Sequence, residues 1–169
     1  MNRNLIRMII LLPGTVLALV PGVLLWVTQG TSWAAELASV GEWRLWIGLV
    51  LGGVGLFLAG WTSHLFLRFG DGTPAPWEPP QKLVVRGPYR HVRNPMISGA
   101  LLVLLAETLL SGSWALAAWL ALFGVFNLLY FPLVEEKELE QRFGADYIEY
   151  KANVARWIPR LRPWTKGQS

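Results

Sequence analysis

The chain has 169 residues, 53% of them hydrophobic and 15% charged, with a net charge of +4 and a mean hydropathy of +0.39. This composition excludes an ordinary soluble domain and indicates a membrane protein, whose length leaves no room for a separate catalytic domain of ~100–150 residues. Cysteine is absent, which excludes disulfides, thiolate nucleophiles and Cys-ligated metals.

Four apolar segments are separated by polar or Gly/Pro-rich breaks: Leu5–Val27, Trp43–Phe69, Met96–Leu110 and Trp114–Val134. A spanning helix needs about 20 apolar residues, with a lower limit of ~17. We therefore expect an all-α integral membrane bundle of about four transmembrane helices, forming a single domain over residues 1–169. Because "SGS" at 111–113 joins the short third segment to the fourth, we expect these two to form a helical hairpin. Pro21 and Gly22 are expected to kink the first helix.

Two polar regions complete the chain. Residues 70–95 are predicted to be a cytoplasmic loop, extended where Pro and Gly are frequent over 70–80. Within the C-terminal segment 135–169, apolar residues recur at helical spacing among charges: Leu139, Phe143, Tyr147 and Tyr150. This pattern predicts an amphipathic helix lying at the membrane surface, with a break at Gly144.

Charge placement orients the bundle. Lys and Arg precede the first helix and follow the second and fourth, and only Arg44 falls on the opposite side. By the positive-inside rule, both termini and the 70–95 loop are expected to be cytoplasmic, as in a bacterial inner membrane. The pI of about 9.8 is explained by these flanking charges, so we expect no nucleic-acid partner. Tryptophans near the helix ends are typical of aromatic belts: Trp33, Trp43, Trp46, Trp77, Trp157 and Trp164.

The first candidate motif is "RGPYRHVRNP", residues 86–95, directly before an apolar helix. Its Gly-Pro and Asn-Pro pairs favour a shaped loop whose backbone amides can face a ligand. Arg93 beside such amides would suit a carboxylate, and Pro95 fits the first position of a helix, whose N-terminus also favours anions. Alternatively, the arginines contact anionic headgroups. His91 could be a base or an interfacial contact.

The second candidate motif is the pair Glu135-Glu136 at the end of the fourth segment. Because Glu135 follows the apolar run directly, we expect it to face the bundle and to pair with an arginine of the first motif or a bound cation. We interpret Glu136, like Glu138 and Glu140, as a surface residue of the amphipathic helix.

Three polar side chains lie within the apolar segments: His64, Glu107 and Asn127. We interpret Glu107 and Asn127 as partners in interhelical hydrogen bonds and His64 as a packing residue. A small transporter would need a polar path across the membrane, and these three side chains offer little of one. No histidine or carboxylate pattern has metal-ligand spacing, so we expect no metal.

Taken together, "GPYRHVRNPMISG", an apolar hairpin and "EEKELEQRFGADYIEYKANVARWIPRL" resemble the C-terminal signature of a superfamily of integral membrane enzymes. This is the isoprenylcysteine carboxyl methyltransferase and phospholipid methyltransferase superfamily. The resemblance covers residues 82–161, and the ordered set of Gly-Pro-Tyr, Arg-x-Pro, Glu-Glu, Phe-Gly-x-x-Tyr and Ile-Pro carries it.

The resemblance implies S-adenosylmethionine as the cofactor, held near the cytoplasmic face, and a lipophilic acceptor that enters from the bilayer. It implies Glu135 and Arg93 as catalytic residues. The residues implied to bind the cofactor are Gln81, Lys82, Leu83, Val84, Gly87, Tyr89, Arg93, Asn94, Pro95, Met96, Ile97 and Glu135. Such a reaction needs alignment of acceptor and methyl group, which can contribute ~7–11 kcal/mol, and no covalent nucleophile.

This chain departs from the family pattern at two places. Asn94 stands where the family often has a histidine before the proline, and Asn cannot titrate. "YFPLVEE" lacks the arginine that isoprenylcysteine enzymes carry shortly before the glutamate. The departures favour a phospholipid amine, an isoprenoid or another hydrophobic small molecule over an isoprenylcysteine acceptor. The alternative is a non-catalytic lipid-binding or scaffold protein on the same fold.

Overall fold

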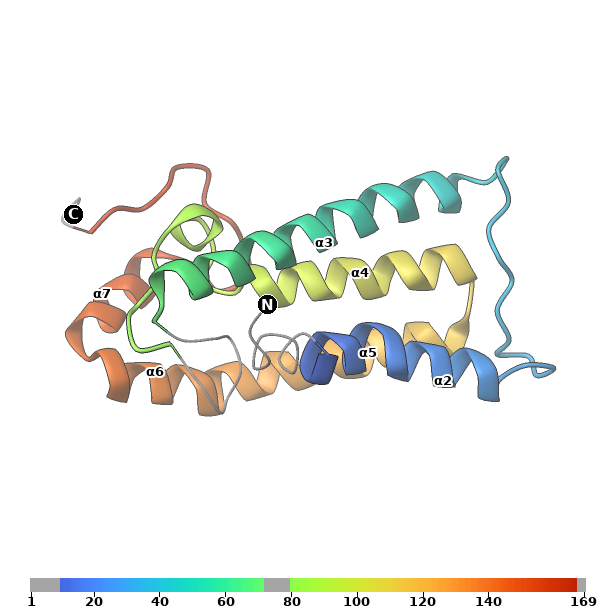
Figure 1. Ribbon diagram of the computed structural model, residues 1–169, viewed down its shortest axis with the longest axis horizontal. Helices are drawn as coiled ribbons and strands as arrows, with labels where there is room; N and C mark the ends of the chain where they lie inside the picture. The colour runs from blue at the N-terminus through green and yellow to red at the C-terminus, as the bar shows by residue number, and fades with distance from the viewer. Residues whose placement is uncertain (1–9, 72–79, 167–169) are drawn as a thin grey trace. The chain divides into compact units, whose positions relative to one another are not determined.

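The computed structural model describes residues 10–71 and 80–166, and this part of the chain is helical without any strand. The all-α prediction is therefore confirmed. The helical elements in chain order are the π-helix η1 (Ile10–Leu19), α2 (Val20–Val27), α3 (Trp43–Phe69), the 3₁₀ turn η2 (Gly87–Arg90), α4 (Pro95–Ser111), α5 (Trp114–Tyr130), the π-turn η3 (Phe131–Glu135), α6 (Glu136–Phe143) and α7 (Ala145–Asn153) (Figure 1).

The predicted apolar segments correspond closely to helices. The second segment equals α3, and the third is α4 with one residue added at each end. The described part of the first segment is helical from Ile10 to Val27. It is π-helical up to Leu19 and α-helical from Val20, and Pro21 lies in the first turn of α2. Residues 5–9 of that segment lie outside the described residues, as do Arg3, Arg7 and Trp77.

The fourth segment differs from the prediction. Helix continues without a break from Trp114 to Phe143, so the expected surface helix is the direct continuation of the fourth apolar helix. This continuous helix ends at Gly144, which has φ +54°, at the position where the sequence predicted a break. Gly tolerates this left-handed backbone because it has no Cβ.

Two helices are long and apolar enough to cross a membrane, namely α3 and the continuous helix 114–143. Two more apolar helices are shorter, Pro13–Val27 and Pro95–Ser111. Large apolar side chains on the long helices are mostly exposed, such as Phe57 and Leu122. This pattern fits helices that face lipid and differs from that of the mostly buried core helices of a soluble protein. Four crossings stay a prediction.

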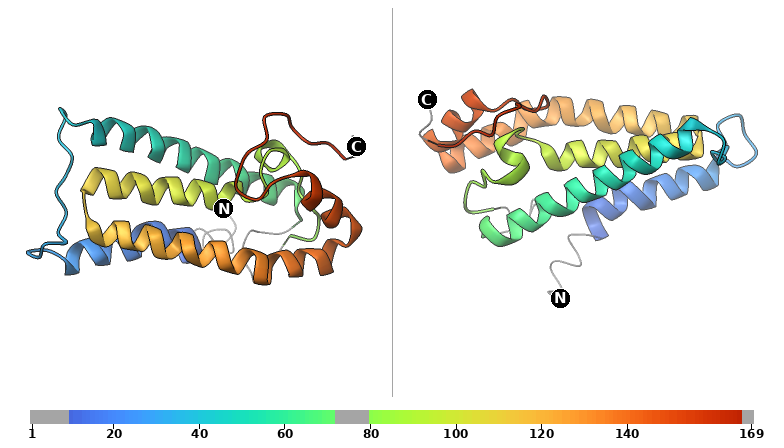
Figure 2. Two further views of the ribbon diagram at one scale, coloured as in Figure 1. Left: turned by 180° about the vertical axis from the view of Figure 1, so that it is seen from behind. Right: turned by 90° about the horizontal axis from the view of Figure 1, so that it is seen from above.

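The chain divides into two compact units, residues 1–57 with 99–126 and residues 58–98 with 127–169. The single domain expected over residues 1–169 stays a prediction. In the first unit, α4 lies between α3 and α5 (Figures 1 and 2). α3 approaches α4 closely: a Cβ on Gly55 would lie 2.7 Å from the Gly99 carbonyl oxygen. Small residues that allow such close approach are typical of helix packing in membranes.

The second unit combines the end of α3, residues 80–98 and the C-terminal part of the chain. The Gly70 carbonyl at the end of α3 accepts hydrogen bonds from the backbone N–H groups of Gln81 and Lys82 at 2.8 and 3.1 Å. One buried cluster joins Leu65, Val84 and Tyr89. A second cluster joins residues from α7 and the tail: Tyr147, Tyr150, Val154 and Trp164. Both candidate motifs lie in this unit.

Candidate functional site

The two sequence motifs meet at a cavity of about 240 Å³ in the second unit. This volume is close to the lower end of the ~300–1,000 Å³ typical of small-molecule sites. Residues 82–84, the start of α4, the η3 turn and the α6–α7 region form its walls. The cavity therefore brings together residues far apart in the sequence, from Phe66 near the end of α3 to Tyr150 on α7.

The predicted cofactor residues divide into those that line the cavity and those that do not. Lining residues are Lys82, Leu83, Val84, Tyr89, Arg93, Asn94, Met96, Ile97 and Glu135. Gln81 and Gly87 do not line it, and neither does Pro95, which is buried at the start of α4. The roles of the lining residues stay predictions.

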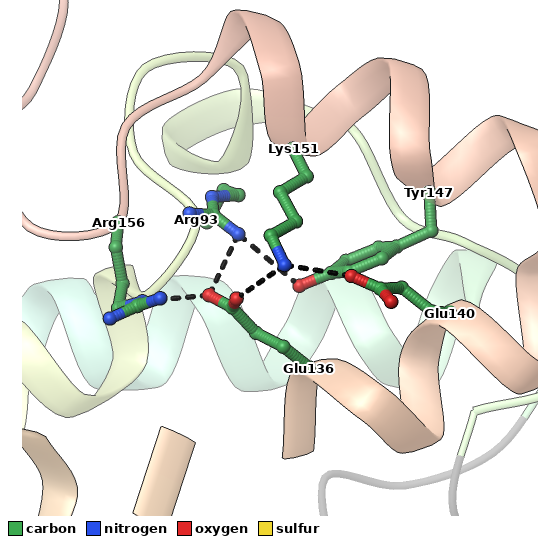
Figure 3. Close-up of polar contacts among 6 residues, drawn as sticks. All are labelled: Arg93, Glu136, Glu140, Tyr147, Lys151 and Arg156. Atoms are coloured by element: carbon green, nitrogen blue, oxygen red, sulfur yellow. Dashed lines mark hydrogen bonds and ion pairs between the residues drawn. The ribbon is translucent and has the colours of Figure 1, made fainter. Parts of the chain in front are cut away.

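Figure 3 shows a cluster of ion pairs centred on Glu136. The cluster adjoins the cavity, because its member Arg93 also lines the cavity. Glu136 Oε1 accepts hydrogen bonds from Arg93 Nη1 at 2.8 Å and from Arg156 Nε at 2.7 Å. Its Oε2 lies 3.0 Å from Lys151 Nζ, which also pairs with Glu140 at 2.7 Å. The Glu136 side chain is only 2% exposed. One buried carboxylate therefore joins α6, α7, the tail and the loop before α4.

The interpretation of Glu136 as a surface residue is wrong. The reason lies in η3, a π-turn that contains Pro132. Pro132 cannot donate a backbone hydrogen bond, and a π-turn adds a residue to the helical turn and so rotates every later side chain around the axis. Uniform α-helical spacing through this turn therefore places Glu136 on the exposed face of the helix, whereas the π-turn rotates it to the buried face.

Glu135 lines the cavity and is partly buried, but it has no ion pair among the described residues. Of the two partners expected for it, the arginine binds the neighbouring Glu136 instead. Glu138 also borders the cavity and is exposed. The cavity therefore has a carboxylate whose charge no basic side chain in the described part of the chain neutralises by a direct ion pair. Such a carboxylate favours a cationic ligand.

Two buried donors at the cavity lack a hydrogen-bond partner among the described residues. They are Asn94 Nδ2, on a side chain that is 4% exposed, and Arg93 Nε. Buried polar groups in folded proteins are nearly always hydrogen-bonded, so unpaired donors at a cavity point to a ligand. Both residues line the cavity.

The loop amides expected to cradle an anion are largely used by the chain itself. Tyr89 N donates to Arg86 O, and the N–H groups of His91 and Val92 both donate to Pro88 O. Arg93 N donates to Ala155 O at 2.9 Å. These four amides of the 86–95 loop are therefore not free to face a ligand, and the side chains of Arg93 and Asn94 supply polar groups at the cavity.

The C-terminal tail holds this loop in place, which the sequence did not indicate. Arg160 N donates to His91 O, and Trp164 N donates to Arg90 O, both at 2.9 Å. His91 Nδ1 lies 2.8 Å from Arg160 O, so its ring contacts the tail and does not line the cavity. The structure supports neither of the two interpretations of His91, a base or an interfacial contact. Instead, His91 links the loop to the C-terminal tail.

Sequence reasoning missed the aromatic wall formed by Tyr147 and Tyr150. The apolar face of residues 139–150 was expected to lie on the membrane surface, but both tyrosines are buried and line the cavity. Tyr150 Oη donates to Tyr89 O at 2.6 Å. The spacing Phe143-Gly144-x-x-Tyr147 was the available signal, because the break at Gly144 lets α7 turn its apolar face onto its own unit.

The aromatic-belt interpretation fails for Trp164. Its side chain is buried and packs against Tyr150, with ring centroids 5.7 Å apart. Trp157 packs edge-on against Phe131 at 6.1 Å. The tail folds these aromatic rings into the second unit, where they stabilise the cavity wall.

Three of the tyrosines that line the cavity, Tyr89, Tyr147 and Tyr150, are protonated at neutral pH. Burial raises the pKa of Tyr89, of Tyr147 and of Tyr150, and the nearby Glu136 carboxylate raises that of Tyr147 further. Their hydroxyls can therefore donate hydrogen bonds, and none acts as a phenolate base.

Three polar side chains of the apolar helices lie elsewhere. His64 is exposed, so the packing interpretation is wrong. Asn127 is buried and engaged in contacts, whereas Glu107 Oε2 is buried without a hydrogen-bond partner in the described ranges. That carboxyl oxygen does not form the expected interhelical hydrogen bond. No group of three or more metal-ligating side chains occurs among residues 10–71 and 80–166.

The fold and the cavity define the class of the protein: it is an all-helical, membrane-associated protein with a cavity lined by apolar, aromatic and polar side chains. A family model described as phospholipid methyltransferase matches residues 43–146, more than half of the chain. The chain belongs to the phospholipid methyltransferase family, which indicates methyl transfer to a lipid-type substrate. The match includes α3, which the sequence motifs did not. No curated protein and no solved structure gives a match.

Proposed function

We propose that this protein transfers a methyl group from S-adenosylmethionine to a lipophilic acceptor at the cytoplasmic face of the membrane. The observation that carries the proposal is Glu135, a carboxylate without an ion pair in the described part of the chain, at a cavity with apolar and aromatic walls. Membership of a methyltransferase family supports it.

The residues at the cavity fit this cofactor by their chemistry. The cofactor has an ammonium, a sulfonium, a carboxylate and an adenine. Glu135 suits a cationic group, and the unpaired donors Asn94 Nδ2 and Arg93 Nε suit the carboxylate or a ring nitrogen. Apolar and aromatic side chains suit the adenine, among them Met96 and Phe143. When bound, S-adenosylmethionine supplies a methyl group activated by its sulfonium.

The protein's own residues bind the cofactor, hold it in one orientation and exclude water from the cavity. Glu136 holds the Arg93 guanidinium, so Arg93 keeps one orientation toward the cavity. Tyr150 fixes the backbone of Tyr89 in the same wall. Fixed orientation of this kind lowers the activation barrier of methyl transfer, because the reacting groups are already aligned. The reaction requires no covalent nucleophile. A protonated amine acceptor would have to lose a proton first.

The acceptor is proposed to be a phospholipid amine or an isoprenoid. Phe131 and Pro132 occupy the positions shortly before Glu135, so no arginine is there to bind the carboxylate of an isoprenylcysteine. The family description, phospholipid methyltransferase, supports a lipid substrate. The distribution of Lys and Arg along the chain supports cytoplasmic termini and a cytoplasmic cavity.

Binding of the cofactor is the first test. Detergent-purified protein is titrated with S-adenosylhomocysteine and with S-adenosylmethionine in a calorimeter. We expect saturable heat, with affinity about tenfold weaker in Glu135→Gln, since a hydrogen bond to a charged group contributes ~1.5–3 kcal/mol. Glu149→Gln removes the same charge from α7 at a position that does not line the cavity, and it serves as the matched control.

The two ligands separate the possible contacts of Glu135. Both carry the ammonium, but only S-adenosylmethionine carries the sulfonium. Equal losses in Glu135→Gln assign the carboxylate to the ammonium, and a larger loss for S-adenosylmethionine assigns it to the sulfonium. Absence of saturable heat in the wild type would favour a non-catalytic lipid-binding protein. Incubation of lipid extracts with methyl-labelled S-adenosylmethionine, followed by mass spectrometry, identifies the acceptor.

A further inference from the structure

A second hollow in the second unit is an open groove beside the end of α3. One wall is apolar and comes from Trp61, Leu65 and Phe69. These residues are four apart, so they form one stripe along the helix. α3 is one of the two helices long and apolar enough to cross a membrane, so the stripe continues a lipid-facing helix.

The rim of the groove is cationic, with Arg86, Arg90 and Lys166 facing a single acidic residue, Asp146. Lys166 Nζ forms an ion pair with Asp146 at 2.7 Å, so the acidic residue of the rim pairs with the lysine and not with Arg86 or Arg90. Arg90 Nε donates to the neutral carbonyl of Trp164 at 2.8 Å, and a second nitrogen donates to the Thr165 hydroxyl. The rim thus keeps two positive charges that its own lining does not neutralise.

Arg86 is held directly above the apolar stripe. Its guanidinium carbon lies 4.4 Å from the centre of the Phe69 ring, and it forms no ion pair within the described ranges. The neighbouring Gly87 has φ +54°, and a Cβ there would lie 3.1 Å from Leu65 and from Trp61. The chain at the rim is therefore packed against the stripe, so the spacing between positive charge and apolar wall is set by the fold.

We propose that this groove binds an anionic phospholipid, with an acyl chain along the α3 stripe and the phosphate at Arg86 and Arg90. The order of chemistry along the groove, apolar and then cationic, matches an anionic lipid and not a free anion, which would leave the apolar wall in water. The groove adjoins the cavity, and Leu83 lines both of them. The two hollows differ beyond this shared wall, because Val84 lines only the cavity, whereas Val85 and Arg86 line only the groove. This inference does not depend on the proposed methyl transfer.

The test measures lipid adducts by native mass spectrometry of the whole protein in detergent, titrated with phosphatidylglycerol or phosphatidylcholine of the same acyl chains. We expect the wild type to prefer phosphatidylglycerol and Arg86→Gln to weaken its binding about fivefold, since one basic residue contributes ~1 kcal/mol toward an anionic lipid. Arg86→Lys should restore much of the preference.

Arg68→Gln is the matched control, because Arg68 lies at the same end of α3 and also contacts the Phe69 ring, at 5.3 Å, but does not line the groove. Its phosphatidylglycerol binding should be almost unchanged. Equal losses in Arg86→Gln and Arg68→Gln, or equal binding of the two lipids by the wild type, would overturn the proposal. Displacement of the lipid by millimolar inorganic phosphate would assign the rim to free anions and overturn it as well. Unchanged thermal unfolding of Arg86→Gln shows that the variant is folded.

Discussion

The two compact units of this protein are stabilised by different interactions. In the described part of the first unit, helices approach each other at glycines, and the ion pair there is Glu42–Arg44. In the second unit, ion pairs converge on the buried Glu136, and tyrosines and tryptophan fill the space around the cavity. One unit has the packing of a lipid-facing helical bundle, and the other has a polar network beside a cavity.

This difference follows from the solvent that each kind of surface meets. In hydrocarbon, apolar side chains gain nothing by leaving lipid for each other, so helix association depends on close van der Waals approach. Charged groups are stable only where partners or water surround them. The charged side chains of the buried ion-pair network therefore lie in the second unit, and the following predictions test that division.

The largest effect is expected for Glu136→Gln. Without the carboxylate, Arg93, which is 8% exposed, loses its ion pair, and Lys151 and Arg156 lose theirs with Glu136. Removing one partner of a buried ion pair typically costs about 3–5 kcal/mol. We expect the free energy of unfolding in detergent, measured by denaturant titration, to fall by that amount. Glu138→Gln should have the same free energy of unfolding as the wild type. If Glu136→Gln were as stable as the wild type, the ion-pair network would not stabilise this unit.

A smaller effect is expected for Gly55→Ala in the first unit. The new methyl group would meet the Gly99 carbonyl at 2.7 Å and Val103 Cγ2 at 2.9 Å. Overpacking of this kind costs about 1–3 kcal/mol. Gly53→Ala is the control, because nothing lies within 4 Å of its Cβ and alanine raises helix propensity. If Gly55→Ala and Gly53→Ala have the same thermal stability, close α3–α4 packing does not stabilise this unit.

The third prediction separates the cavity from the groove within the second unit. Glu135→Gln should weaken S-adenosylhomocysteine binding about tenfold and leave phosphatidylglycerol binding unchanged. Arg86→Gln should weaken phosphatidylglycerol binding about fivefold and leave S-adenosylhomocysteine binding unchanged. Calorimetry and native mass spectrometry measure the two affinities on the same preparations. Loss of both affinities in either variant would show that cavity and groove act as one site.

The smallest effect concerns Glu42, the acidic partner of the ion pair in the first unit. Hydrogen bonds from Ser39 N and then from Arg44 lower the pKa of this carboxyl to about 2. Because the folded-state pKa lies below the unfolded value, the stabilisation is complete above about pH 5 and disappears as the pH falls toward 2. The melting temperature should exceed that of Glu42→Gln slightly at pH 6, and the difference should shrink by pH 3. A difference independent of pH would assign the effect to packing.

Much of the fold was predictable because apolar length and breaker residues act locally. The bounds of α3, the start of α4 at Pro95 and the helix end at Gly144 all follow from residues at those positions. The failures arose where the outcome depended on distant residues. Trp164 was expected at a membrane interface because nothing nearby shows that the tail pairs with residues 90–93.

The roles of Glu135 and Glu136 show the same limit within two adjacent residues. Both carboxylates follow an apolar run, so composition and position cannot distinguish them. The π-turn at Pro132 sets their angle around the helix, and Arg93, Lys151 and Arg156 then arrive from three other segments to surround only Glu136.

By itself, the sequence determined that this is an all-α, membrane-associated protein and which stretches carry its charge, because solvent preference and backbone freedom belong to each residue individually. Only the tertiary structure decided which carboxylate pairs with Arg93 and which one lines the cavity without an ion pair. The physical reason is that ion pairing and burial depend on the distance between side chains, and folding of the loop, α7 and the tail sets those distances.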